Sequence, residues 1–433
     1  MTVLDIAAGS NWSPRVRHVA GPLRWALLGV LCVLALAYAA SRIREGKSRP
    51  ATAAFALGGA VIGIAFISGL WSVEPRVTVQ RLVAFATILV TAGALAFAVA
   101  GRRAAAERIL LGVLAGAVLV ALAGIGILIV KPDNAMQLAT TSTPARYRGL
   151  GQNPNTVAML FAVAMPIAVW VAITRRGAWR YAGLASLLLL AGSIVASGSR
   201  GALIAGFVGS LAPAIAASRS ARVAALAAAG CAAALGVGVA VAQIPNPNPH
   251  ATGYSSANTT PCTPRDAECS LRLQDEIGRP AGGGYVPTKH RSIFGSSGRG
   301  QAWHGALEQG AKRPVAGYGF GTESRVFVDR YYSFEGGVPE NSYIGMFLQL
   351  GAVGVGVFVA LLASLVVAGG RALVSAERQG RVLAATCGAV LLVGLALGLF
   401  QSYLYAAGNN ATLSVWICAF LLTALAARPR TSS

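Results

Sequence analysis

Charged residues are scarce in this sequence, and acidic residues are scarcer still. Asp, Glu, Lys and Arg make up 12% of the 433 residues, whereas 55% are hydrophobic. A single soluble domain needs more polar surface than this composition provides. The first twenty residues also lack an apolar core, so we expect no cleavable signal peptide. The composition therefore indicates a protein whose main partner is the lipid bilayer.

Long apolar runs recur along the chain, and each is long enough to cross about 30 Å of hydrocarbon as a helix. They lack the alternation of apolar and polar residues that marks the strands of a membrane barrel, which excludes that class. We predict an all-α polytopic membrane protein with about 11 or 12 transmembrane helices. The predicted spans are 25–40, 51–70, 82–100, 109–130, 158–173, 181–196, 202–217, 223–242, 343–368, 382–399 and 413–427.

A formal net charge of +21 is compatible with nucleic acid binding. The positions of the basic residues decide whether that function is needed to explain the charge. If eleven helices alternate in direction, all six basic clusters fall on one side, which the positive-inside rule makes cytoplasmic. No nucleic acid partner is needed to explain the charge. The clusters are Arg42, Arg44, Lys47 and Arg49; Arg102, Arg103 and Arg108; Arg175, Arg176 and Arg180; Arg219 and Arg222; Arg371, Arg378 and Arg381; Arg428 and Arg430. An N-terminus outside the cytoplasm follows from eleven helices, and a twelfth would move it inside.

The longest segment on the opposite side, 243–341, is predicted to form a periplasmic loop domain, or cap, with short helices at 270–277, 300–309 and 323–332. It separates eight N-terminal helices in 1–242 from three C-terminal helices in 342–433. Four of the six cysteines lie in apolar runs, and the cap holds Cys262 and Cys269. In an oxidising periplasm these two are a disulfide candidate, and two free thiols are the alternative.

Arginines near the outer face go against the positive-inside trend and need a local reason. Arg146 and Arg148 precede the fifth predicted helix in a glycine-containing stretch. Two guanidiniums can bind an anionic group through bidentate hydrogen bonds. Asn153 or Asn155 would cap the helix, whose free N–H groups favour the same anion. The alternative is interfacial snorkelling beside an ordinary helix cap.

Two further arginines occupy defined positions. Arg200 stands in a tight turn between two predicted helices, where it either binds an anion or fixes the turn through carbonyl contacts. In the cap, Arg299 lies one helical turn before Trp303, on the same face, and Arg291 is just upstream. The glycines of 317–322 resemble a nucleotide-binding loop only superficially, because no strand precedes them, so we expect a bent connector.

A candidate base lies at the start of the ninth predicted helix. Glu340 and Asn341 precede it directly, and a carboxylate at an apolar boundary can accept a proton from a sugar hydroxyl. The alternative for Glu340 is a helix N-terminal charge, and Glu74 is the competing outer carboxylate. No Cys/His spacing suggests zinc, and no Asp-x-Asp pair is present, so we expect neither a metal nor a cofactor.

Taken in order, several of these segments resemble the O-antigen ligase and polymerase superfamily of bacterial surface-polysaccharide enzymes. They are 71–75, 148–155, 199–201, Arg299 with Trp303, 317–321 and 341–343, within about residues 70–354. The resemblance implies a metal-independent, inverting glycosyltransferase of the bacterial inner membrane. It implies transfer of a glycan from undecaprenyl pyrophosphate to an acceptor hydroxyl on the periplasmic side.

The resemblance also distributes roles over the candidate residues. Those expected to bind the pyrophosphate are Arg146, Arg148, Asn153, Asn155, Arg200, Arg291 and Arg299, and those expected to bind or position the acceptor are Asn341, Tyr343, Trp303, His304 and Glu74. Family members usually carry His where this sequence has Glu340, so the base is Glu340 or another cap residue such as His304. With lipid A-core as acceptor the protein is a ligase, which we favour; with a second lipid-linked repeat it is a polymerase. A flippase would predict charges deep within helices and an internal repeat, and neither is visible.

Overall fold

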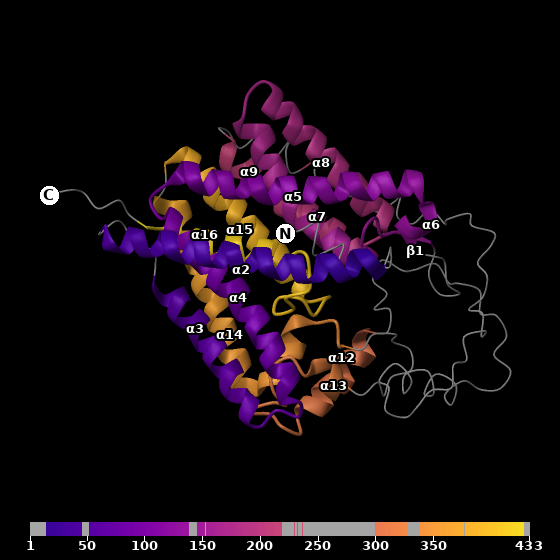
Figure 1. The fold of residues 1–433 in the computed structure, drawn as a ribbon. Coiled ribbons are helices and arrows are strands. Elements are labelled where there is room, and N and C mark those ends of the chain that lie inside the picture. Colours follow the sequence, from indigo (N-terminus) through magenta and orange to yellow (C-terminus); the bar gives the residue numbers. More distant parts are fainter. Residues whose placement is uncertain are drawn as a thin grey trace.

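The computed structural model describes residues 14–45, 52–137, 145–151, 153–218, 299–327, 338–375 and 377–427, with the single positions 229, 232 and 236. In these segments the chain forms a bundle of helices (Figure 1), of which nine are long and apolar enough to cross a membrane. Its only described strands are two residues long. The prediction of an all-α polytopic membrane protein is confirmed.

The helices and strands have the following bounds. The helices are α2 (Pro14–Arg44), α3 (Thr52–Ile67), α4 (Pro75–Val99), α5 (Arg103–Val130), α6 (Pro132–Ala135), α7 (Pro154–Thr174), α8 (Ala178–Ser197), α9 (Arg200–Ala217), α12 (Arg299–Gly310), α13 (Glu323–Val326), α14 (Ser342–Ser375), α15 (Arg378–Gly398) and α16 (Thr412–Leu425), with a 3-10 turn, η1 (Ser68–Leu70). The strands β1 (Met136–Gln137) and β2 (Arg146–Tyr147) pair antiparallel, with Met136 opposite Tyr147.

Ten of the eleven predicted spans fall on described helices, and the remaining one, 223–242, lies outside the described residues except for positions 229, 232 and 236. One boundary was wrong. The span predicted at 82–100 starts too late, because α4 already begins at Pro75. Proline suits the first turn of a helix, because it has no N–H to leave unpaired and its φ angle is already helical. The short helix expected at 300–309 is present as α12. Of the one expected at 323–332, α13 covers 323–326, and 328–332 lies outside the described part, as does 270–277.

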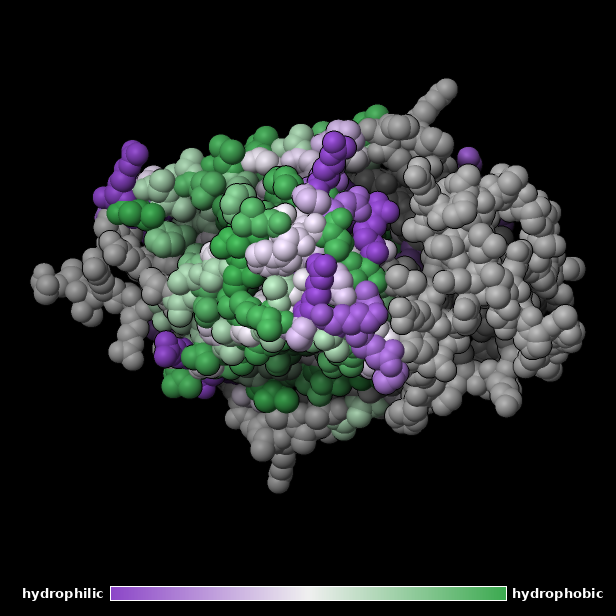
Figure 2. All heavy atoms as spheres, turned by 90° about the horizontal axis from the view of Figure 1, so that it is seen from below, coloured by the Kyte–Doolittle hydropathy of each residue, from purple (hydrophilic) through white to green (hydrophobic). Residues whose placement is uncertain are grey.

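Helix α7 is the centre of the bundle. It packs against α8, α9 and α15, and nearly every residue from Val157 to Ala172 is buried. A helix that is apolar on all sides is stable only when protein or lipid surrounds it completely. The outer helices instead expose large apolar side chains, such as Ile129 on α5 and Leu188 on α8. Hydrophobic residues cover the middle of the face in Figure 2, and the most hydrophilic residues lie toward its two ends, as expected for a lipid-facing belt.

Basic residues from several clusters meet at one end of the bundle, which we call the basic end. The Arg42 guanidinium donates to the Ala100 carbonyl, and Arg102 donates to the Tyr38 hydroxyl. Arg175 of the α7–α8 loop lies 2.6 Å from Glu107 at the start of α5. Arg378 at the start of α15 donates to the Ala217 carbonyl at the end of α9. The described clusters therefore share one end, as the alternation of helices predicts; Lys47, Arg49, Arg219, Arg222, Arg428 and Arg430 lie outside the described residues.

Residues 314–321, the glycine connector, lie against a break in α14. Gly351 interrupts that helix with φ 62° and ψ −162°. The Ala352 N–H donates to the Pro314 carbonyl at 2.7 Å, and the Gly319 N–H donates to the Gln349 carbonyl at 2.8 Å. A Cβ atom on Gly317, whose φ is +66°, would collide with the Gln349 backbone. The prediction of a bent connector is confirmed.

Candidate active site

Helices α7, α9 and α14 begin at the end of the bundle opposite to the basic end. Chain direction requires this, because α7 and α14 end beside Arg175 and Arg371, while α9 ends beside Arg378. Helix starts carry unpaired N–H groups and a partial positive charge, which favour anions. Two sets of predicted site residues lie here. The bundle group is Arg146, Arg148, Asn153, Asn155 and Arg200; the cap group is Arg299, Trp303, Glu340 and Asn341.

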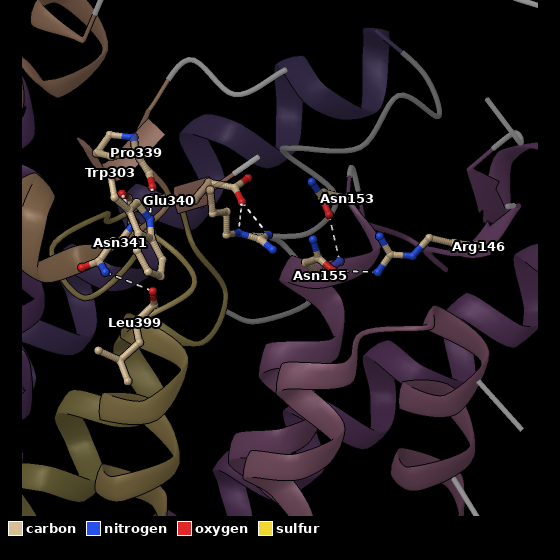
Figure 3. A network of polar contacts seen from close by, with 10 residues as sticks. Arg146, Asn153, Asn155, Trp303, Pro339, Glu340, Asn341 and Leu399 are labelled. Carbon is tan, nitrogen blue, oxygen red and sulfur yellow. Dashed lines mark hydrogen bonds and ion pairs between the residues drawn. The ribbon is translucent and has the colours of Figure 1, made fainter. Parts of the chain in front are cut away.

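In the bundle group, Arg146 ties the start of α7 to the end of α8. Its Nε donates to the Ser197 carbonyl at 2.7 Å and its Nη2 to Asn155 Oδ1 at 2.6 Å (Figure 3). Asn153 caps α7, because its side chain accepts a hydrogen bond of 2.8 Å from the Asn155 N–H. The prediction that Asn153 or Asn155 caps this helix is confirmed. Arg146 is only 8% exposed and already committed to these partners, so its contacts are those of an internal brace.

Arg148 is placed differently from Arg146. Its Nε donates to the Asn134 carbonyl at 3.1 Å, and its other two guanidinium nitrogens have no hydrogen-bond partner among the described residues. Partial burial lowers the pKa of Arg148 from its ordinary value. An arginine stays charged under such a shift, so Arg148 offers a positive fork with room for an anion.

Tyr147, between the two arginines, points the other way. Successive side chains of a strand alternate, and Tyr147 is buried against Gly124 of α5 and Gly149. Burial raises the pKa of Tyr147 to about 12. Side chains on either glycine would meet the tyrosine ring or hydroxyl. Tyr147 was not among the predicted site residues, and its place between two arginines was the available signal.

In the cap group, α12 faces the segment just before α14. The Arg299 guanidinium contacts Glu340 Oε2 through Nη2 at 2.6 Å and Nε at 3.0 Å. Trp303 donates from Nε1 to the Pro339 carbonyl at 2.9 Å. Arg299 and Trp303 therefore share one face of the helix, as their spacing predicts. Glu340 has a φ of +47°, and it is the one non-glycine residue in the described segments with a positive φ. Such a backbone costs of order 1–3 kcal/mol and persists only where surrounding contacts impose it.

Asn341 and Tyr343 fix the start of α14. The Asn341 side-chain oxygen accepts hydrogen bonds from the N–H groups of Tyr343 at 2.9 Å and Ile344 at 3.1 Å. Its amide donates to the Leu399 carbonyl at 3.1 Å, and the Tyr343 hydroxyl donates to the Leu395 carbonyl at 2.9 Å. The predicted position of Asn341 at the helix start is confirmed. Both side chains hold α14 against α15 and the segment that follows α15.

The two groups meet through Arg200 and Arg299. Arg200 is the first residue of α9, and it lies close enough to Arg299 for the two positive charges to repel each other. Both side chains are partly buried. In Figure 3, Glu340 and Asn341 lie on one side of the view, and Asn155 and Arg146 lie on the other. Two partly buried cations near each other can bind a multiply charged anion.

Some predicted site residues have partners elsewhere. Glu74, at the start of α4, lies 2.9 Å from Arg325 Nε. His304 lies 3.2 Å from Glu308 on the same helix, with its side chain 68% exposed. Arg291, Cys262 and Cys269 lie outside the described residues. Among the described side chains, no three His, Cys, Asp or Glu gather closely enough to hold a metal ion.

Glu323, which the sequence analysis did not select, is the most deeply buried acidic residue of this region. Its carboxylate accepts hydrogen bonds from Ser402 Oγ at 2.6 Å and the Tyr405 hydroxyl at 2.6 Å. A third comes from Gln349 Nε2 at 3.1 Å. Burial raises the pKa of Glu323 to about 7, although the hydrogen bonds from Ser402 and Tyr405 and the charge of Arg81 oppose the shift. A single acid two residues after the last connector glycine gives no periodic signal, so sequence alone could not reveal its burial.

A comparison with known families finds one match in this region. The family model described as O-antigen ligase matches residues 185–359. This stretch includes Arg200, Arg299 and Glu340, together with Glu323, whereas the other four residues of the bundle group precede it. A comparison with curated proteins gives no match to this chain.

Proposed function

From the place of this chain in the O-antigen ligase and polymerase superfamily, we propose that it is a membrane glycosyltransferase of the ligase type. It transfers a glycan from undecaprenyl pyrophosphate to a sugar hydroxyl of lipid A-core. The observation that carries the proposal is the convergence of Arg200 and Arg299, with Glu340 bound to Arg299, inside the stretch that matches the family.

The arginines act on the leaving group. When the bond between the anomeric carbon and the diphosphate oxygen breaks, the electron pair stays on the diphosphate and increases its negative charge. Arg200 and Arg299 are held where that charge develops, and Arg148 supplies a further positive fork from β2 and the turn after it. Fixed guanidiniums in a water-poor site stabilise such charge without reorganisation, so no metal ion is required.

Glu340 acts on the acceptor. Its carboxylate takes the proton of the acceptor hydroxyl while the hydroxyl oxygen forms the new bond to the anomeric carbon. Attack from the face opposite to the diphosphate inverts the configuration at that carbon. Arg299 orients Glu340 through two hydrogen bonds and also faces Arg200, so it links the base to the leaving-group site.

The orientation in the membrane follows from the basic end. Lys and Arg residues near helix ends favour the cytoplasm, so the basic end lies there and the candidate site lies on the periplasmic side of the inner membrane. Lipid-linked glycans are presented to such a site from the outer leaflet. The helix starts of α7, α9 and α14 are then at the depth of the lipid headgroups.

The test uses the full-length protein purified in detergent. It is incubated with undecaprenyl-pyrophosphate-linked glycan, with and without lipid A-core, and each mixture is run with and without EDTA. We expect glycosylated lipid A-core, unaffected by EDTA. Chain growth from the donor alone would instead identify a polymerase, and the absence of product with either acceptor would refute the proposal.

Variants locate the site in the same assay. Arg148→Ala, Arg200→Ala and Arg299→Ala are each expected to abolish transfer while the protein is still produced. Lys312→Ala is the control, because this exposed cap lysine contacts only Gln309 among the described residues. Near-normal product from all three arginine variants would contradict the proposed site.

A further inference from the structure

Glu323 lies where three separate parts of the chain meet. It begins α13, directly after the glycine connector, while Gln349 comes from α14 and Ser402 and Tyr405 come from the segment between α15 and α16. A buried carboxylate that accepts three hydrogen bonds holds these three parts of the chain together, because moving them apart would break a charge-assisted hydrogen bond to each donor.

Glu323 is linked to the backbone beside the candidate base, Glu340, through the hydroxyl of Ser402. The Asn341 N–H donates to Ser402 Oγ at 3.1 Å, and the Ser402 hydroxyl donates to Glu323 Oε1 at 2.6 Å. The Asn341 N–H belongs to the peptide bond that follows Glu340. Because Glu340 has a left-handed backbone, the position of this peptide determines where its side chain points.

We infer that Glu323 is a positioning residue for glycan transfer: through Ser402, its buried side chain holds the Glu340–Asn341 peptide so that Glu340 faces Arg299. The inference rests on the proposed function only in naming glycan transfer as the reaction that the positioning serves. The chain of hydrogen bonds itself is independent of the reaction. Glu323 touches neither substrate nor reacting atoms. It acts by keeping a strained backbone in place.

The positioning is expected to depend on pH. The titratable or charged groups that face Glu323 are Tyr405, from the segment before α16, and Arg81 of α4; Ser402 and Gln349 are neutral. Because burial raises the pKa of Glu323 to about 7, its charge changes near neutral pH. The charged form is the better acceptor for the Ser402 hydroxyl, which fixes the direction of the chain from the Asn341 N–H to the carboxylate. Transfer is therefore expected to rise as Glu323 ionises.

The experiment compares Glu323→Gln and Ser402→Ala with wild type, and Glu308→Gln serves as the control. Glu308 is a half-exposed carboxylate on α12 that lies 3.2 Å from His304 Nε2. For each protein, kcat and KM for the lipid-linked donor are measured between pH 5.5 and 8.5 (assay conditions, chosen to span the titration at about 7). Hydrogen exchange of the peptide covering residues 338–345 is measured in parallel, without substrate.

We expect both variants to lower kcat about tenfold, with KM for the donor within about twofold, because misplacing a reacting group lowers the chemical step more than binding. Amide exchange in 338–345 is expected to speed up in both. The rise of kcat near neutral pH should disappear in Glu323→Gln and remain in Glu308→Gln. Ser402→Ala carries the test if the glutamine variant does not fold.

The outcomes separate the two proposals. Unchanged exchange in 338–345 in a folded variant overturns the positioning role, whether or not the protein transfers glycan. Loss of activity with an unchanged pH profile and a raised KM also overturns it, since that result describes a general structural defect. If wild type transfers no glycan, the proposed function fails, and the exchange measurement alone decides the role of Glu323.

Discussion

Arg299 and Glu340 lie 41 residues apart in the chain, and Nε and Nη2 of Arg299 both donate to one carboxylate oxygen of Glu340, Oε2, with an Nη2–Oε2 distance of 2.6 Å. Their side chains are 22% and 20% exposed, so the pair is only partly screened by solvent. A diphosphate that binds between Arg200 and Arg299 competes with Glu340 for the same guanidinium. In the proposed reaction, donor binding is therefore expected to be coupled to the freedom of the carboxylate to meet the acceptor hydroxyl.

A double-mutant cycle tests whether this pair acts as a unit. Arg299→Ala and Glu340→Gln are each expected to lower kcat by about 100-fold or more, through lost charge stabilisation and lost base catalysis. Since the groups act in one step, the double variant should be little worse than the poorer single variant. Transfer rates of the three proteins and of Lys312→Ala are compared; multiplicative losses would mean that the two residues act independently.

Substitution of the two arginines on either side of Tyr147 is expected to affect different properties, stability for Arg146 and glycan transfer for Arg148. Arg146→Ala leaves the Ser197 carbonyl and Asn155 without their donor in a buried setting, so it should lower stability by about 2–4 kcal/mol. Arg148→Ala removes one hydrogen bond and a half-buried charge, so it should lose transfer with little change in stability. Apparent Tm in detergent and transfer rate are measured for both, and an equal drop in Tm would contradict the distinction.

Glu323 predicts how stability depends on pH. Its pKa is about 7 in the folded protein against 4.5 for an ordinary glutamate, so the folded state holds the proton more tightly. The contribution of Glu323 is fully present below pH 4.5 and is lost as pH rises through 7, by up to about 3 kcal/mol. Apparent Tm is recorded against pH for wild type, Glu323→Gln and Glu308→Gln. The slope should flatten only in Glu323→Gln; an unchanged slope there would assign the pH dependence to other groups.

The glycine connector predicts a strong and local effect of a single methyl group. Gly317→Ala places a Cβ against the Gln349 backbone at a φ of +66°, so it should cost about 2 kcal/mol or more. Gly356→Ala is the matched control, because a Cβ there meets nothing within 4 Å and alanine favours the helix. Apparent Tm separates the two variants; a tolerated Gly317→Ala would show that the connector can move away from α14.

Much of the fold was predictable because apolar length is a local property. The spans on α5, α7 and α15 follow from uninterrupted apolar runs, and the cap at Asn153 follows from an asparagine before a proline. The shared face of Arg299 and Trp303 follows from helical spacing alone. In each case the deciding residues lie within a few positions of one another.

The rest depends on contacts between distant parts of the chain. Glu323 is buried by residues 79 and 82 positions away, and the sequence contains no periodic sign of that meeting. Arg146 and Arg148 look equivalent in the sequence, but of the two only Arg146 donates a hydrogen bond to the end of α8. The same holds for Tyr147, whose burial requires a glycine on α5. Tertiary packing, and not the local sequence pattern, determines which of these side chains are buried and which partners they bind.

The break at Gly351 has a consequence for the lipid environment. It divides α14 into a short segment, 342–350, that begins at the candidate site, and a long segment, 352–375, that crosses the hydrocarbon. A long helix adjusts its tilt when the thickness of the bilayer changes. Because the pivot lies at the glycine connector, such tilting leaves the turn at Glu340 undisturbed. Turnover should therefore be nearly the same in vesicles of short-chain and long-chain phospholipids.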